Sequence, residues 1–119
     1  MALIGGTLFV ANTDAVLGFP YRDGKTRIEA KGELIARLPA NAPNGHWTKN
    51  LLAHPNGESL FVAIGSNGNI GELGPEAEQG RAGIWQLDLA TRELVPFAKG
   101  LRNPVGMAWH SPTDTLWTV

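Results

Sequence analysis

Two polar positions whose side chains could do chemistry lie 56 residues apart, at His46 and Arg102. His46 lies in the phrase Gly-His-Trp-Thr-Lys-Asn, and Arg102 is followed by Asn103 in the phrase Leu-Arg-Asn-Pro-Val-Gly. A neutral histidine can take a proton near pH 7, and an arginine beside an asparagine can hold an anionic or carbonyl-rich ligand. The pattern predicts a site for proton transfer and ligand binding, if the fold brings the two loops together.

The distance between these residues coincides with an internal repeat. Three near copies of one phrase, at residues 7–10, 59–62 and 115–118, start 52 and then 56 residues apart, and His54 and His110 recur at the same offset. A repeat of roughly 40–50 residues built from short strands is typical of the blades of a β-propeller. We therefore predict an all-β fold in which His46 and Arg102 precede the innermost strands of successive blades. Both would then lie at one mouth of the central channel, where propellers usually bind ligands.

Short apolar or alternating runs closed by Gly, Pro, Asn or Asp predict nine strands and no helix. The predicted strands cover residues 6–12, 15–21, 32–38, 48–54, 59–65, 83–89, 93–98, 105–110 and 115–119. With four strands per blade, counted from the channel outward, residues 48–98 form one complete blade. Residues 6–38 then supply the last three strands of the preceding blade, and residues 105–119 begin the next. Residues 1–119 are thus predicted to be a single, partial propeller of a little over two blades.

A partial propeller leaves strand edges unpaired and apolar blade faces uncovered. We therefore expect either that copies of the chain assemble or that the chain is a fragment of a longer protein. A closed homotrimer, which would supply about six blades, is the specific form of the first expectation.

The composition excludes several classes of partner. The chain has 119 residues, 43% of them hydrophobic, and a net charge of −1, so neither nucleic acid nor an anionic membrane is predicted to bind it. It has no cysteine, which excludes disulfides and thiolate metal sites. No export signal and no apolar run long enough to span a membrane is recognisable.

Three segments together resemble a known enzyme family, at residues 45–50, 61–67 and 100–108. They are similar to the sorbosone dehydrogenase branch of the sugar dehydrogenases, which are related to soluble glucose dehydrogenase. The resemblance covers most of residues 46–119 and, more loosely, residues 6–40, and its most specific part is the phrase Arg-Asn-Pro-x-Gly. It implies a six-bladed propeller that oxidises a sugar with pyrroloquinoline quinone (PQQ) and calcium, in the periplasm.

The resemblance also implies roles for individual residues. His46 matches the catalytic base that takes the proton of the sugar hydroxyl as hydride passes to the quinone, and Arg102 and Asn103 match the pair that contacts the quinone oxygens. Ser66 stands where the family has an aspartate that orients the histidine, so we expect this support to be weaker or to come from elsewhere. The family's calcium-binding loop follows the strand at 115–119, and its other basic quinone contacts belong to later blades. We therefore expect one chain alone to lack a complete site, and we assign no metal ligand within it.

Other polar residues are interpreted as structural or solvated. His54 and His110 precede hairpin turns, and Lys49 stays outside the predicted site, although it could face the channel. The segment 65–71 has the spacing G-x-x-G-x-x-G with no following helix, which indicates a flexible interstrand loop rather than a nucleotide site. The carboxylates that follow it are interpreted as a solvated loop; they are Glu72, Glu76 and Glu78.

Two other functions are compatible with the fold. The chain could be a non-enzymatic propeller module whose mouth binds a protein or a ligand. It could also resemble a lactonase, but that reaction needs carboxylate or asparagine ligands around a metal, which His46, Arg102 and Asn103 do not supply. The family resemblance favours the dehydrogenase, with an uncharged sugar as the small-molecule partner.

Overall fold

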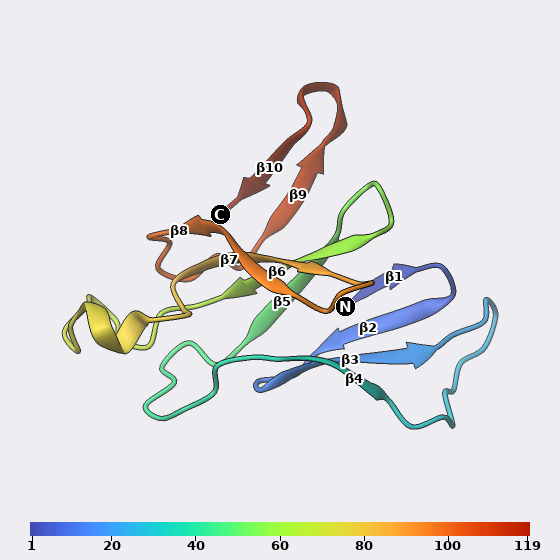
Figure 1. The fold of residues 1–119 in the computed structure, drawn as a ribbon, viewed down its shortest axis with the longest axis horizontal. Coiled ribbons are helices and arrows are strands. Elements are labelled where there is room, and N and C mark those ends of the chain that lie inside the picture. The colour runs from blue at the N-terminus through green and yellow to red at the C-terminus, as the bar shows by residue number, and fades with distance from the viewer.

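The computed structural model describes residues 1–119 as ten strands in three antiparallel sheets (Figure 1). The first sheet contains, in order, β1 (Ala2–Ile4), β2 (Thr7–Ala11), β3 (Ala15–Pro20) and β4 (Glu33–Arg37). The second contains β5 (Lys49–Ala53), β6 (Ser59–Ile64), β7 (Gly83–Asp88) and β8 (Leu94–Lys99). The third is a hairpin of β9 (Met107–His110) and β10 (Thr115–Thr118). The predicted all-β, partial-propeller fold is confirmed.

The only helical elements are two short 3-10 helices in loops, η1 (Pro75–Glu78) and η2 (Ser111–Thr113). Neither they nor any other helix has the length and apolar character that crossing a membrane would require.

The three sheets follow one another as blades, with their first strands side by side. β5 packs against β1 on one side and against β9 on the other. Within each blade the strands pair in chain order, and each runs antiparallel to the one before it. Since β5 and β9 are the first strands of successive blades, the loops that enter them, which hold His46 and Arg102, lie at the same end of the molecule.

β6 is the centre of the fold and is buried at all six positions. Successive side chains of a strand point to opposite faces of the sheet. Leu60, Val62 and Ile64 belong to the apolar core shared with the first blade, whereas Phe61 and Ala63 belong to the core that faces the β9–β10 hairpin. The second blade therefore joins the three sheets through a separate apolar core on each face, and each large side chain buried there stabilises the fold by about 1.5–3 kcal/mol.

The first blade has one strand more than the sequence predicts. The nine predicted strands correspond to β2 through β10, but the predicted range 6–38 omits β1, which pairs with β2. The two strands are joined by Gly5 and Gly6, with φ angles of 52° and 77°. Positive φ at both central residues is what the tightest hairpin turns require, and Gly-Gly supplies it. The three-residue strand is too short to show an alternating pattern, so this turn was the only sequence signal for it.

One long connection stands out from the blades (Figure 1). The β6–β7 loop, residues 65–82, contains η1 and extends beyond the end of the second blade at which β5 begins. It is this loop that organises the candidate site.

Candidate active site

His46 lies on a loop that is bonded to the β6–β7 loop through the backbone. The N–H of Gly45 donates to the carbonyl of Asn67 at 3.0 Å, and the N–H of His46 donates to the carbonyl of Ser66 at 3.2 Å. These two bonds extend the pairing of β5 with β6 beyond the end of the sheet. The imidazole is therefore held on ordered backbone rather than on a free loop.

The contacts of the His46 ring define its tautomer. Nδ1 lies 2.9 Å from the carbonyl oxygen of Ser66 and 3.0 Å from the Ser66 hydroxyl. A carbonyl can only accept, and the Ser66 hydroxyl already donates to the carbonyl of Gly68 at 2.7 Å. Nδ1 therefore has the proton, and Nε2 keeps its lone pair. Ser66 is only 7% exposed, so this arrangement is sheltered from water.

These contacts show how His46 is supported although Ser66 stands in place of the family's aspartate. The sequence places a serine where the resembled family has an orienting aspartate, and support for His46 was expected to be weaker or to come from elsewhere. In the structure, Ser66 itself supplies the support, through its backbone carbonyl as well as its hydroxyl. Sequence comparison cannot detect this, because a backbone acceptor leaves no mark on residue type.

Gly65 brings His46 and Asn103 together. A Cβ atom at Gly65 would lie 2.4 Å from the Cβ of His46 and 2.5 Å from Oδ1 of Asn103, closer than real Cβ contacts allow. The two predicted site residues therefore pack side by side over a position where only glycine fits. The structure thus unites the His46 loop with the loop that enters β9.

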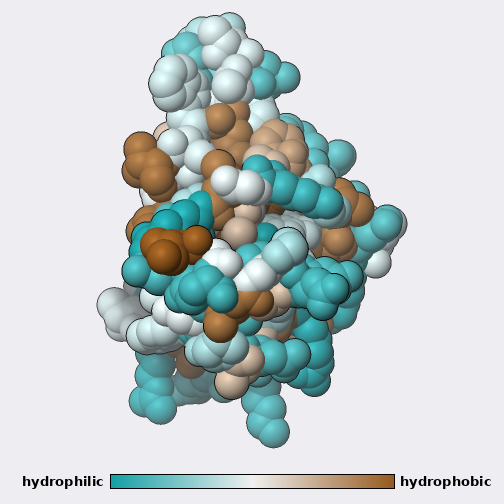
Figure 2. All heavy atoms as spheres, turned by 90° about the vertical axis from the view of Figure 1, so that its left-hand side faces the viewer, coloured by the Kyte–Doolittle hydropathy of each residue, from teal (hydrophilic) through white to brown (hydrophobic).

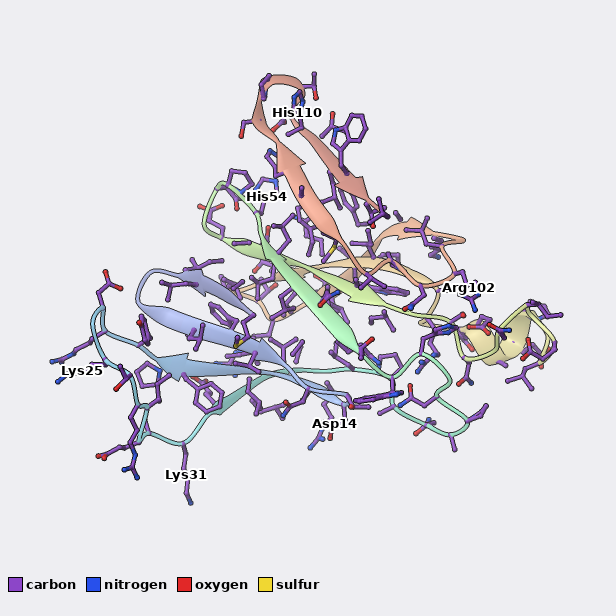
Figure 3. All side chains as sticks on the ribbon, turned by 180° about the vertical axis from the view of Figure 1, so that it is seen from behind. Asp14, Lys25, Lys31, His54, Arg102 and His110 are labelled. Atoms are coloured by element: carbon purple, nitrogen blue, oxygen red, sulfur yellow. The ribbon has the colours of Figure 1, made fainter.

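Arg102 is anchored on the other side of the β6–β7 loop. Its carbonyl accepts the N–H of Ser66 at 2.7 Å, so the same residue binds both the His46 loop and the Arg102 loop. Nε of its guanidinium donates to the carbonyl of Asn69 at 2.7 Å, and one terminal nitrogen donates to the Asn69 side chain. Figure 3 shows Arg102 extending toward the β6–β7 loop. Its exposed guanidinium is therefore oriented before any ligand arrives.

Two pockets meet at Asn69. The smaller pocket, of about 310 Å³, is lined by His46 and Glu72. The larger pocket, of about 560 Å³, is lined by Arg102 and Lys99, with Trp85 at its apolar wall. Asn69 lines both. A volume of several hundred Å³ is typical of small-molecule sites. The predicted base and the predicted quinone contact thus face adjoining pockets rather than a single cavity within this chain.

The carboxylates of the β6–β7 loop are exposed or half-buried, in line with their interpretation from the sequence, but two of the three also hold the backbone of the loop. Glu78 accepts the backbone N–H of Asn67 at 2.6 Å and that of Gly68 at 2.8 Å. Glu72 accepts the N–H groups of Asn69 at 2.9 Å and of Ile70 at 2.8 Å. These backbone hydrogen bonds, with a smaller contribution from the charge of Arg102, lower the pKa of Glu72 to about 2. Both carboxylates fix the shape of the loop that touches His46 and Arg102.

Arg81, which sequence reasoning missed, is the central donor beneath the site. It is 6% exposed, and it donates to the carbonyls of Pro39 at 3.0 Å and His46 at 3.2 Å and to Oδ1 of Asn44 at 2.7 Å. Burial lowers the pKa of its guanidinium, and the charge of Glu78 acts in the opposite direction. Arg81 therefore connects the end of the first blade, the His46 loop and the start of β7.

Lys49 is buried, so its interpretation as a solvated lysine is wrong. It is 8% exposed, and its Nζ donates to the carbonyl of Trp47 at 3.1 Å. Burial, with a smaller contribution from the charge of Arg81, lowers the pKa of Lys49 from 10.5 to about 8. Two cations thus lie under the loop that presents His46, and Lys49 is the one that can lose its proton in the mildly alkaline range.

This pKa shift predicts how stability depends on pH. Between pH 8 and 10.5 the unfolded chain binds the Lys49 proton more tightly than the folded chain, so the free energy of unfolding should rise with pH across this window. Below pH 8 the amine of Lys49 is protonated in both the folded and the unfolded chain, so its contribution to the free energy of unfolding no longer changes with pH. Urea denaturation of the wild type at several pH values should show the rise, and Lys49→Met should lose it. Lys99→Met, which alters an exposed lysine, should keep it; an equal rise in Lys49→Met would contradict the assignment.

The other two histidines lie away from the site, as Figure 3 shows. His54 packs against Phe61 and Trp109, with ring centroids 5.4 Å and 4.7 Å away, and His110 bonds to the Thr113 hydroxyl at 2.7 Å. Both have structural contacts of their own, in line with their interpretation from the sequence. No three His, Asp or Glu side chains lie close enough together to hold a metal ion.

Comparison with known proteins gives one match. A family model described as TrAA12-like matches residues 1–119, and this family is related to the sugar dehydrogenases of the pyrroloquinoline quinone type. No curated protein and no solved structure matches the chain.

Proposed function

The chain belongs to the TrAA12-like family, and on that premise we propose that it supplies the proton-accepting and quinone-contacting parts of a sugar dehydrogenase site. In this proposal His46 is the general base, and Arg102 with Asn103 contacts PQQ. The observation that supports it most is the free Nε2 of His46, on a ring whose other nitrogen is fixed by Ser66.

His46 has the chemistry that a base for sugar oxidation needs. A hydroxyl group gives up its proton more readily to a positioned imidazole than to water, because the imidazole is neutral and basic near pH 7. When Nε2 takes the proton, the ring becomes a cation whose Nδ1–H still donates to the carbonyl of Ser66. That contact keeps the ring in the same orientation before and after the transfer.

Arg102 and Asn103 provide donors suited to an electron-rich quinone. When bound, PQQ would supply the electron-accepting group, while the protein orients and polarises it. The guanidinium of Arg102 offers several N–H donors in one plane, and Asn69 holds it in place. The pocket beside it is also lined by the cations Lys99 and Arg81, by one carboxylate, that of Glu78, and by the apolar Trp85 and Leu101. The excess of cations and the apolar wall suit a flat, anionic ring system. The residues present therefore fit PQQ.

Calcium does not fit the residues of this chain. No group of three potential ligands among its His, Asp and Glu side chains comes together, and both Glu72 and Glu78 already accept backbone hydrogen bonds. We therefore derive no step through calcium. The residues of this chain act on the sugar and the quinone.

We propose an uncharged sugar as the substrate and the periplasm as the place of action, both by analogy with the resembled family. The face that carries the β6–β7 loop mixes hydrophilic and apolar atoms and has no large area of one kind (Figure 2). Beside Arg102, the anionic Glu72 balances the charge. A mixed surface of this kind suits a polyhydroxylated, neutral ligand better than a nucleic acid or a membrane, and we propose neither of those as a partner.

The test is sugar-dependent reduction of the quinone. Because one chain alone is expected to lack a complete site, the chain is used at a high concentration, at which copies can combine. It is mixed with PQQ and calcium without oxygen, neutral aldoses are added one at a time, and the absorbance of the oxidised quinone is followed. The proposal predicts loss of this absorbance with at least one sugar, and its recovery when a dye acceptor is added. Binding of PQQ without reduction by any sugar would contradict the catalytic proposal and would favour a non-enzymatic binding module.

A further inference from the structure

Four successive backbone N–H groups of the β6–β7 loop donate to carboxylates of the same loop. Those of residues 67 and 68 bond to Glu78, and those of residues 69 and 70 bond to Glu72. Successive N–H groups in a turn form a concavity of positive potential that binds anions. The loop therefore has the backbone of an anion site, and its own side chains occupy that site.

The part of this backbone at residues 68–70 is shaped for a carboxylate. The N–H of Asn69 donates to both oxygens of Glu72, each at 2.9 Å, and the N–H of Ile70 donates to Oε2 at 2.8 Å. A Cβ at Gly68 would lie only 2.8 Å from the same Oε2, so the carboxylate fits here because residue 68 is glycine. We call Gly68 and the N–H groups of Asn69 and Ile70 the carboxylate nest.

Arg102 adds a fixed positive charge beside the carboxylate nest. Its guanidinium bonds to the carbonyl and the side chain of Asn69, and the N–H of the same residue belongs to the nest. The N–H groups, and to a smaller extent the charge of Arg102, lower the pKa of Glu72. Aimed backbone donors and a nearby cation are the features by which proteins capture free carboxylates.

Glu72 is placed so that a ligand can displace it. Its side chain is exposed and bonds to no other residue than Asn69 and Ile70. Glu78, in contrast, is half-buried and lies near the charge of Arg81. An incoming carboxylate can therefore replace that of Glu72 without leaving the two N–H groups unpaired.

We propose that the carboxylate nest binds the carboxylate of a small organic acid, and that Glu72 occupies the nest until this ligand displaces it. The rest of the ligand would lie in the pocket of about 310 Å³ that Glu72 and His46 both line. Two acids have the required group: the sugar acid formed when an aldose is oxidised at C1 and its lactone hydrolysed, and PQQ itself. The choice of these two acids rests on the proposed function, whereas the nest rests on its own geometry.

Titration of the isotope-labelled chain with D-gluconate tests the proposal, with the backbone amide shifts of Asn69 and Ile70 as the signal. Gluconate at high concentration should shift both signals in the wild type. In Glu72→Ala the same shifts should occur at a concentration about tenfold lower, because a tethered competitor acts at an effective concentration on the order of millimolar. D-Sorbitol, a neutral polyol of the same length, should shift neither signal.

Glu76→Ala is the matched control for Glu72→Ala. Glu76 is an exposed carboxylate of the same loop, in η1, and it belongs to no hydrogen bond of the carboxylate nest. Its removal changes the net charge of the chain by the same amount. Glu76→Ala should therefore titrate with gluconate like the wild type.

Two further measurements keep the test decisive if Glu72→Ala loosens the loop and its Asn69 and Ile70 signals are lost. Gluconate should then restore these signals, because its carboxylate replaces the missing one. Glu72→Gln, whose amide oxygen can still accept one N–H, should bind gluconate with an affinity between those of the wild type and Glu72→Ala. A parallel titration with PQQ identifies which of the two acids shifts the Asn69 and Ile70 signals at the lower concentration.

Three results would overturn the proposal. These are equal gluconate titrations of the wild type and Glu72→Ala, equal shifts with sorbitol and with gluconate, and a loosened loop that gluconate does not restore. All of them concern binding at residues 69 and 70 and need no turnover. Failure here therefore leaves the reduction of the quinone by a sugar untouched, and failure of that reaction leaves gluconate binding to the carboxylate nest as expected.

Discussion

His46→Gln is expected to lower kcat for sugar oxidation by about 10²–10⁴-fold, while the affinity for PQQ changes little. Glutamine is close in length to histidine, and its amide N–H can still donate to the carbonyl of Ser66. It has no basic nitrogen, however, so the sugar hydroxyl would have to lose its proton to water. The change therefore removes the proton acceptor and keeps the local contacts.

The measurement is the steady-state rate with a dye acceptor, together with the Kd for PQQ from calorimetry. His54→Gln is the matched control, since it changes a histidine that stacks on Trp109 away from the site. The control should keep most of the activity once its folding has been checked. Equal losses in the two variants would point to general destabilisation, and an unchanged rate in His46→Gln would exclude His46 as the base.

Arg81→Met is expected to destabilise the chain by about 3 kcal/mol and to disorder the His46 loop. Methionine fills a similar volume but donates nothing, so Pro39, Asn44 and His46 each lose a donor to a buried or half-buried oxygen. Each acceptor left unpaired inside a protein costs about 1–3 kcal/mol. The change also removes a cation that burial disfavours, which offsets part of the summed cost of the three acceptors. Urea denaturation measures the stability, and the NMR shifts of the His46 ring report the state of the loop.

Arg92→Met is the matched control for Arg81. Arg92 forms an ion pair with Glu33, but both side chains are about half exposed, and such surface pairs contribute roughly 0–1 kcal/mol. The change Arg92→Met should leave the NMR shifts of the His46 ring unchanged. Arg81→Met could instead prove as stable as Arg92→Met and leave the His46 signals unaltered. That result would show that the hydrogen bonds of Arg81 do not position His46.

The regular part of the fold follows from the sequence because strand signals are local. Alternating residues and turn formers locate β2 through β10, and the repeat places His46 and Arg102 before equivalent strands. β1 was not predicted, because three residues are too few to show the two-residue alternation of a strand.

The support of the site could not be predicted in the same way. Arg81 reaches acceptors 35 to 42 residues away, and its partners are mostly backbone oxygens, which every residue type provides. Glu78 was interpreted as solvated because its loop is rich in Gly and Pro, yet its carboxylate satisfies two backbone N–H groups. One signal was available: Arg81 stands just before β7 at the end of a polar loop. A charge at the start of a buried strand needs partners there.

A calorimetric titration of the purified chain with PQQ in the presence of calcium tests whether the His46 and Arg102 loops bind the quinone. Because one chain alone is expected to lack the quinone contacts of the later blades, we expect weak but saturable binding to the wild type. Binding to Arg102→Met should be markedly weaker still, since that variant loses the guanidinium that Asn69 holds at the pocket. Arg22→Met, which alters an arginine in the separate loop between β3 and β4, should bind like the wild type. Absence of binding to the wild type, or equal binding to Arg102→Met, would contradict the claim that these loops contact the quinone.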